Sequence, residues 1–188
     1  ACGGLPAWRA DHDSGSGLEK EKKMKMIVAV AKDWAIGYNG QLLAHNKEDM
    51  KFFRDTTTGN LVVMGRKTLE SFPGGRPLKN RDNLVLTTDA SYVKEGAVIV
   101  HTMEEALKQI KEYEVTGKDC FIIGGESIYR QFLPFCDTCY VTKMDAVYPA
   151  DTFFPDLDLE KDWKLTEQSE QKEYPDGTFT FCTYQKQA

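Results

Sequence analysis

The feature that most limits the fold of this chain is a series of short, uninterrupted apolar runs. The first covers residues 26–31, and similar runs follow at 61–64, 84–86, 97–100 and 120–123. A strand that is covered on both faces has this continuous apolar character, whereas a strand with one face in solvent alternates between apolar and polar residues. The runs therefore predict buried strands of a sheet.

Helical patterns separate these runs or follow them. They cover residues 48–57, 67–72, 103–114 and 126–133. Strands that alternate with helices along a chain form a largely parallel sheet with helices packed on both of its faces. The order of the elements therefore predicts an α/β fold.

The last third of the chain has a different pattern. Residues 140–144, 163–169 and 178–184 have the character of strands, and the last of these segments alternates between apolar and polar residues. The sequence Pro-Asp-Gly at 175–177 predicts a hairpin turn between the last two segments. We therefore expect a single twisted, mostly parallel sheet that ends in antiparallel C-terminal edge strands.

The composition of the chain limits the classes of molecule that it is expected to bind. The chain has 188 residues, of which 41% are hydrophobic and 28% are charged, and its net charge is -5. A mildly acidic chain of this size is expected to form one domain and to bind neither nucleic acid nor an anionic membrane as its main partner. No apolar run approaches the length of a membrane span, so we expect a cytoplasmic protein.

The first 24 residues differ from the rest of the chain. They are rich in Gly, Ser and charged residues and have no apolar period. Such a segment is typical of a flexible or vector-derived extension. We therefore expect an extension at 1–24 and a single catalytic domain at 25–188.

Five cysteines do not indicate a disulfide framework, because their number is odd and their spacing is irregular. Cys136 and Cys139 form a C-x-x-C pair, which can belong to a redox site or to half of a zinc site. The chain has no second pair of this kind, and its three histidines are scattered. We expect reduced thiols and no metal.

In a parallel sheet of this kind, ligands bind beyond the carboxyl ends of the strands. The run at 61–64 is followed by Gly65, Arg66, Lys67 and Thr68 at the start of a helix. A glycine, free N–H groups at a helix start and two cations suit a phosphate, although a tight turn with solvent-facing cations would have the same sequence. This strand end is one candidate for an anion site.

Two further strand ends carry related features. Thr87 and Thr88 offer hydroxyl groups after the run at 84–86, and Gly124 and Gly125 separate the run at 120–123 from the next helix. Paired glycines allow the backbone to approach a pyrophosphate closely. Together these strand ends predict a dinucleotide that is bound from two sides.

Asp49 is the candidate acid. It lies in the first turn of the helix at 48–57, after the expected N-cap Asn46, and shares a side of that helix with Phe52 and Phe53. A carboxylate here can complement the helix dipole, or it can have a ligand as its partner beside an apolar face. The helix alone leaves both interpretations open.

An ordered set of residues along 26–185 resembles the bacterial dihydrofolate reductases. The set consists of Ile36, Gly37, Asp49, Phe52, Phe53, residues 63–68, residues 75–78, Arg81, residues 123–126, Tyr129 and residues 151–155. The resemblance implies a dihydrofolate reductase-like fold and reduction of 7,8-dihydrofolate to tetrahydrofolate by NADPH, with hydride transfer to C6 and protonation at N5. It also implies a monomer that supplies one-carbon metabolism and is a target of antifolate inhibitors.

The resemblance also implies roles for individual residues. Asp49, Leu42, Tyr129 and Thr142 would be the catalytic residues, with Thr142 bonded to Asp49. The substrate would contact Asp49 and Thr142 together with Ile27, Val28, Met50, Phe53, Leu78, Arg81 and Ile123. The cofactor would contact Ala29, Ile36, Gly37, Leu42, Gly65, Arg66, Lys67, Thr68, Leu86, Thr87, Thr88, Gly124, Gly125, Glu126, Ser127, Ile128 and Tyr129.

The chain departs from the family pattern beside the expected acid. Leu43 and Ala44 occupy positions where many members have Pro-Trp, and Lys47 replaces a Pro. We therefore expect a difference in the covering loop or in the delivery of the proton. Two other functions stay open: a related pterin or pyrimidine reductase of the riboflavin-synthesis type, and a nucleotide-binding module without catalytic activity.

Overall fold

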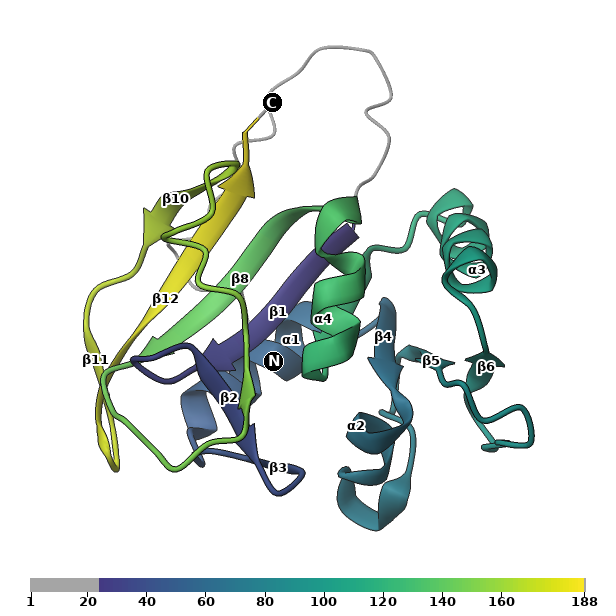
Figure 1. The fold of residues 1–188 in the computed structure, drawn as a ribbon, viewed down its shortest axis with the longest axis horizontal. Helices are drawn as coiled ribbons and strands as arrows, with labels where there is room; N and C mark the ends of the chain where they lie inside the picture. The colour runs from purple at the N-terminus through teal and green to yellow at the C-terminus, as the bar shows by residue number, and fades with distance from the viewer. Residues whose placement is uncertain (1–23, 188) are drawn as a thin grey trace, which may run out of the picture.

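The computed structural model describes residues 24–187. Within this range the main sheet has the strand order β10-β12-β8-β1-β7-β4-β5-β6, with β11 paired to β12 (Figure 1). Its strands are β1 (Met24–Val30), β4 (Leu61–Gly65), β5 (Asp82–Leu86), β6 (Val98–Val100), β7 (Cys120–Gly124), β8 (Cys136–Met144), β10 (Trp163–Gln168), β11 (Lys172–Tyr174) and β12 (Gly177–Lys186). Neighbouring strands in the part of this order from β8 through β1, β7, β4 and β5 to β6 pair parallel. The pairs that involve β10, β11 and β12 are antiparallel.

The helices cover both faces of this sheet. In Figure 1, α4 lies in front of the sheet and α1 behind it. Buried side chains of α3 and α4 belong to one apolar cluster, whereas Phe52 of α1 and Leu69 of α2 belong to a second. The helices are α1 (Lys47–Thr57), α2 (Arg66–Glu70), α3 (Met103–Val115) and α4 (Glu126–Phe132), with short 3-10 helices at Pro73–Gly75 and Leu133–Phe135.

The sequence correctly predicted this α/β architecture. Each predicted buried strand and helix is present, with bounds that differ by a few residues. β8, which was grouped with the C-terminal strands, pairs parallel to β1, and the antiparallel part begins with β12. The predicted hairpin turn connects β12 to β11, a strand that the sequence did not predict.

A small second sheet was also missed. It has the order β3-β2-β9 and consists of β2 (Ala35–Tyr38), β3 (Gln41–Leu42) and β9 (Thr152–Phe153). Strands of two to four residues carry too few side chains to show a periodic pattern. This sheet joins the segment after β1 to the segment after β8.

The predicted extension at 1–24 lies outside the described residues except for Met24, which begins β1. The assignment of 25–188 as one domain stays a prediction. Cys120, Cys136, Cys139 and Cys182 are buried and free. Within the described range, no helix is long and apolar enough to cross a membrane.

Asn46 determines where α1 begins. Its side chain is buried and accepts a hydrogen bond from Asp49 N at 3.1 Å. This bond satisfies one of the N–H groups that every helix leaves unpaired at its start. The cap therefore fixes the turn that carries Asp49.

We expect Asn46→Ala to lower the free energy of unfolding by about 1 kcal/mol, because the helix loses its cap. Urea titration would measure this change. Asn46→Ser retains an oxygen acceptor and should lose less. Equal stability of the alanine variant and the unmodified protein would contradict the role of Asn46 as a cap.

Candidate active site

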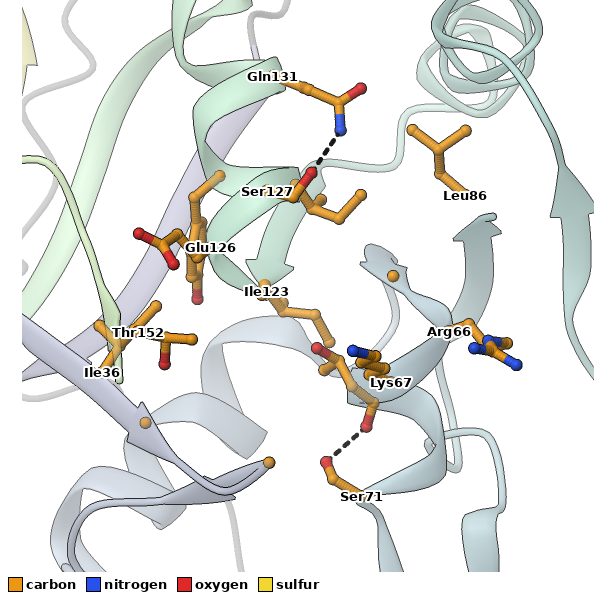
Figure 2. A pocket seen from close by; sticks show the side chains of 18 of the residues that line it. Ile36, Arg66, Lys67, Ser71, Leu86, Ile123, Glu126, Ser127, Gln131 and Thr152 are labelled. Carbon is orange, nitrogen blue, oxygen red and sulfur yellow. Dashed lines mark hydrogen bonds between the residues drawn. The ribbon is translucent and has the colours of Figure 1, made fainter. Parts of the chain in front are cut away.

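A cleft of about 1010 Å³ opens at the carboxyl ends of the parallel strands (Figure 2). Its wall includes the ends of β4, β5 and β7, the first turns of α2 and α4, and the β2–β3 segment. Ile36 and Thr152 in Figure 2 come from the small sheet, and Arg66 and Lys67 from the start of α2. Segments that are far apart in the sequence thus meet around one cavity.

The structure brings together every residue predicted to contact the cofactor. All of them line this cleft, and the predicted substrate residues Val28 and Ile123 line it as well. The cleft also has lining residues that the sequence analysis missed, namely Gly40, Gln41, Ser71, His101, Thr102, Met103, Gln131, Asp151 and Thr152. His101 and Thr102 directly follow β6, so the same search of strand ends could have found them.

The starts of α2 and α4 are suited to an anion. Their N-caps are Gly65 and Gly125, which have no side chain to accept a hydrogen bond from the first N–H groups of the helix. Arg66 and Lys67 add positive charge at the start of α2. N–H groups and cations at one end of a cleft are the donor set that phosphate groups require.

Two glycines are needed where backbone and side chains come close together. Gly124 has φ +120°, and a Cβ atom there would lie 3.2 Å from Tyr129 Cε2. A Cβ atom on Gly37 would lie 2.7 Å from Thr152 Oγ1. The peptide bond between Gly124 and Gly125 is cis. A larger residue at Gly37 or Gly124 would push the cleft wall out of place.

Asp49 lies beside the cleft and belongs to the α1 side of the sheet. Thr142 Oγ1 donates a hydrogen bond of 2.5 Å to Asp49 Oδ1, as predicted. Thr142 is the register partner of Ala29, a residue of the cleft wall. Burial raises the pKa of Asp49 to about 6, and the hydrogen bond from Thr142 opposes this shift. The carboxyl group can therefore hold a proton near neutral pH.

The remaining predicted substrate residues lie mostly on the same face of the sheet as Asp49. Ile27 belongs to the apolar cluster on that face, and Phe53, Leu78 and Ile123 pack against the cluster. Ala44, at the position where many family members have Trp, packs there too. Val28 and Met50 are the exceptions: Val28 belongs to the apolar cluster on the other face, and 49% of the surface of Met50 is exposed.

Arg81 is held at the edge of this apolar face. Its guanidinium group lies 6.0 Å from the centroid of the Phe53 ring and donates a hydrogen bond of 3.2 Å to Thr57 Oγ1. Partial burial, with a smaller effect of Arg54, lowers its pKa. The loop before Arg81 is fixed by the buried Asn83 side chain. Asn83 Oδ1 accepts a hydrogen bond from Leu78 N, and Asn83 Nδ2 donates one to Leu78 O, each at 3.0 Å. A hydrogen-bonded cation at the edge of an apolar face suits a carboxylate ligand.

Comparison with known proteins identifies the family. The profile described as "Dihydrofolate reductase" matches residues 23–186. The chain belongs to the dihydrofolate reductase family. Its activity is the NADPH-dependent reduction of dihydrofolate.

Individual relatives agree with this assignment. The dihydrofolate reductase HdrB of Haloferax volcanii is 36% identical over 92% of this chain and 89% of its own length. The Bacillus subtilis dihydrofolate reductase is 33% identical over 87% of this chain and 94% of its own length. A solved structure of the Enterococcus faecalis dihydrofolate reductase, complexed with NADP(H) and RAB-propyl, has a TM-score of 0.79 and 30% identity, and covers 89% of this chain and 98% of its own.

The raised pKa of Asp49 has a consequence for the stability of this reductase. The pKa is about 6 in the folded state, against an ordinary value of 3.8. The folded protein therefore binds this proton more tightly than the unfolded chain does. As the pH rises from about 4 to about 6, ionisation of Asp49 lowers the free energy of unfolding, by up to about 3 kcal/mol.

We expect Asp49→Asn to be more stable than the unmodified reductase by about 2 to 3 kcal/mol at pH 7, because asparagine cannot ionise. The difference should shrink towards zero below about pH 3, where Asp49 is protonated in both the folded and the unfolded state. Urea unfolding over this pH range measures it. Asp55→Asn, at an exposed position on the same helix, should give no gain. A gain of equal size at both pH values would show that ionisation is not the cause.

Proposed function

We propose that Asp49 is the group that holds the pterin and controls protonation of its N5 atom. This proposal is supported chiefly by one observation: a carboxyl group with a pKa of about 6 lies on an apolar face beside the dinucleotide cleft. In this proposal the carboxyl group bonds the 2-amino group and N3 of the pterin. Because part of the Asp49 population is protonated near neutral pH, the site can help to deliver a proton.

NADPH would occupy the cleft, where it supplies the hydride that reaches C6 of the pterin. In this proposal, Ala29, Ile36 and Leu42 flank the nicotinamide, with Gly37 and Tyr129 at the same end. The pyrophosphate follows Gly124, Gly125, Glu126, Ser127 and Ile128. The adenosine end, including the 2′-phosphate, contacts Gly65, Arg66, Lys67, Thr68, Leu86, Thr87 and Thr88. The donor set at the starts of α2 and α4 supports this orientation.

The substrate would lie between the cleft and α1. Ile27, Val28, Met50, Phe53, Leu78 and Ile123 would line the groove for the pterin and aminobenzoyl rings, and antifolate inhibitors would compete for it. Arg81 would pair with the α-carboxylate of the glutamate tail, because a guanidinium group binds a carboxylate through two parallel hydrogen bonds. The placement of Arg81 over Phe53 at the edge of the apolar face supports this role.

Catalysis then depends mainly on orientation. In this proposal Thr142 fixes the Asp49 carboxyl group, and Tyr129 and Leu42 help to hold the nicotinamide against the pterin. Two flat rings that are held face to face in a dry cleft react faster because little orientational freedom remains to be lost. The chain itself thus binds, orients and excludes water.

Two other functions fit these residues less well. A reductase of the riboflavin-synthesis type would use the glycine-rich strand end but would have no need for Arg81 beside the groove. A nucleotide-binding module would have no use for a carboxyl group with a raised pKa on an apolar face. A monomeric state and a cytoplasmic location stay predictions.

We expect Asp49→Asn to lose most activity at pH 7 and to recover part of it at low pH, where the substrate is already protonated in solution. The absorbance at 340 nm with NADPH and dihydrofolate follows the reaction. Asp55→Asn on the same helix should keep a normal pH profile. A flat profile for Asp49→Asn, or activity equal to that of the unmodified enzyme, would contradict the proposed role of Asp49.

We expect Arg81→Leu to raise KM for dihydrofolate by about 10-fold or more, because the glutamate carboxylate loses a charged partner worth about 1.5 to 3 kcal/mol. KM for NADPH should stay unchanged. Arg76→Leu, which changes an exposed cation in the same loop, is the matched control. If Arg81→Leu weakened NADPH binding instead, Arg81 would belong to the cofactor site.

A further inference from the structure

Trp34 lies between β1 and β2 in a conformation that is unusual for a large residue. Its φ is 65°, in the left-handed region, and only 6% of its surface is exposed. Residues other than glycine, asparagine and aspartate rarely adopt this conformation, and a buried indole at such a position needs compensating contacts. The next residues, Ala35 and Ile36, begin the strand that forms one wall of the cleft.

A continuous row of aromatic rings leads from Trp34 to the cleft. The Trp34 ring stacks on Phe154 with a centroid distance of 6.2 Å, and Phe154 meets Tyr129 edge to face at 4.9 Å. Tyr129 lines the cleft, and its hydroxyl group donates a hydrogen bond of 2.8 Å to Ile27 O. Packed side chains of this kind have few alternative arrangements, so a shift of one ring displaces the next.

The backbone joins the same residues. Phe154 N donates a hydrogen bond of 2.8 Å to Trp34 O, and Ala35 is the register partner of Phe153 in the small sheet. β2 and the residues after β8 are therefore fixed to each other at the position of the indole. Movement of Trp34 would move both Ile36 and Tyr129, which lie on different walls of the cleft.

The other side of the indole is held by a polar cluster. Lys143 Nζ lies 4.9 Å from the centroid of the Trp34 ring, bonds Asp158 Oδ2 at 2.9 Å and donates to Tyr184 OH at 3.0 Å. Tyr184 packs edge to face on Trp34 at 5.8 Å and donates to Asp158 Oδ1 at 2.7 Å. An ammonium group over an indole face is attractive, and its ties to Asp158 and Tyr184 fix where the cation lies.

We propose that Trp34 is a positioning residue for hydride transfer. Lys143 and Tyr184 hold its indole, and the indole in turn fixes the position of β2 and, through Phe154, that of Tyr129 at the nicotinamide end of the cleft. Trp34 itself is not one of the residues that line the cleft. The inference rests on the proposed placement of the nicotinamide beside Ile36 and Tyr129. Its effect is on the geometry of the two reacting rings and leaves the charge of Asp49, on the other face of the sheet, unchanged.

The test compares Trp34→Leu with Trp163→Leu, which removes another buried indole on the edge strand β10, away from the cleft. Both variants should lose thermal stability. Only Trp34→Leu should slow single-turnover hydride transfer per titrated active site, by about 10-fold, because small misplacement of reacting groups has effects of this size or larger. KM for NADPH and dihydrofolate should change little, and the deuterium isotope effect on kcat should rise.

Two further variants keep the test decisive if Trp34→Leu does not fold. Trp34→Phe retains a ring against Phe154 and should keep most of the hydride-transfer rate. Phe154→Leu breaks the row without replacing Trp34 or Tyr129, and should cause a loss similar to that of Trp34→Leu. In the double variant that combines Trp34→Leu with Phe154→Leu, the two losses of rate should not multiply, since both changes break the same row of rings.

Normal hydride transfer in Trp34→Leu and Phe154→Leu, or an equal loss in Trp163→Leu, would overturn the inference. Losses that multiply in the double variant would show that Trp34 and Phe154 act separately, and would overturn it too. These outcomes are distinct from a failure of the proposed function. That failure would be seen in the pH profile of Asp49→Asn. The Trp34 variants retain Asp49, so the pH profile of their activity should have the same midpoint as that of the unmodified enzyme.

Discussion

The hydrogen bond from Thr142 to Asp49 is the contact on which the rest of the site depends. It joins α1 to β8 across 93 residues of sequence and fixes an acid beside the wall that Ala29 forms. Burial raises the pKa of this acid to about 6, so the protein carries a carboxyl group that costs stability once it ionises. The proposed role of Asp49 in binding and protonating the pterin would give this group a function that offsets its cost to stability.

The parallel sheet explains how the two ligands can meet. Carboxyl ends of parallel strands lie at one edge, and the residues that follow β4, β5 and β7 therefore surround one cleft. α1 packs on one face of the sheet and α4 on the other, with β1 between them. Asp49 comes from the first face and Tyr129 from the second. In the proposed placement of the two ligands, the acid and the hydride donor would approach the substrate from different sides of the sheet.

The small sheet joins the segment that follows β1 to the segment that follows β8. β2 and β9 pair with each other, and Trp34 and Phe154 lie at the end of that pairing, where a row of rings leads to Tyr129. Gly37 approaches Thr152 so closely that a side chain would not fit. The β2–β3 wall of the cleft is therefore attached to the core at Trp34 and to β9 at Gly37, while Leu42 farther along is 78% exposed.

The sequence by itself determined the buried strands, the helices between them and the glycine-rich strand ends, because these features depend on local composition and period. The resemblance then assigned the cofactor residues, all of which line the cleft. Only the tertiary structure decided the pairing of β8, the strands β2, β3, β9 and β11, and the row from Trp34 to Tyr129. Strands of two to four residues give no periodic signal, and a contact such as that of Trp34 with Phe154 depends on distant segments that the fold brings together.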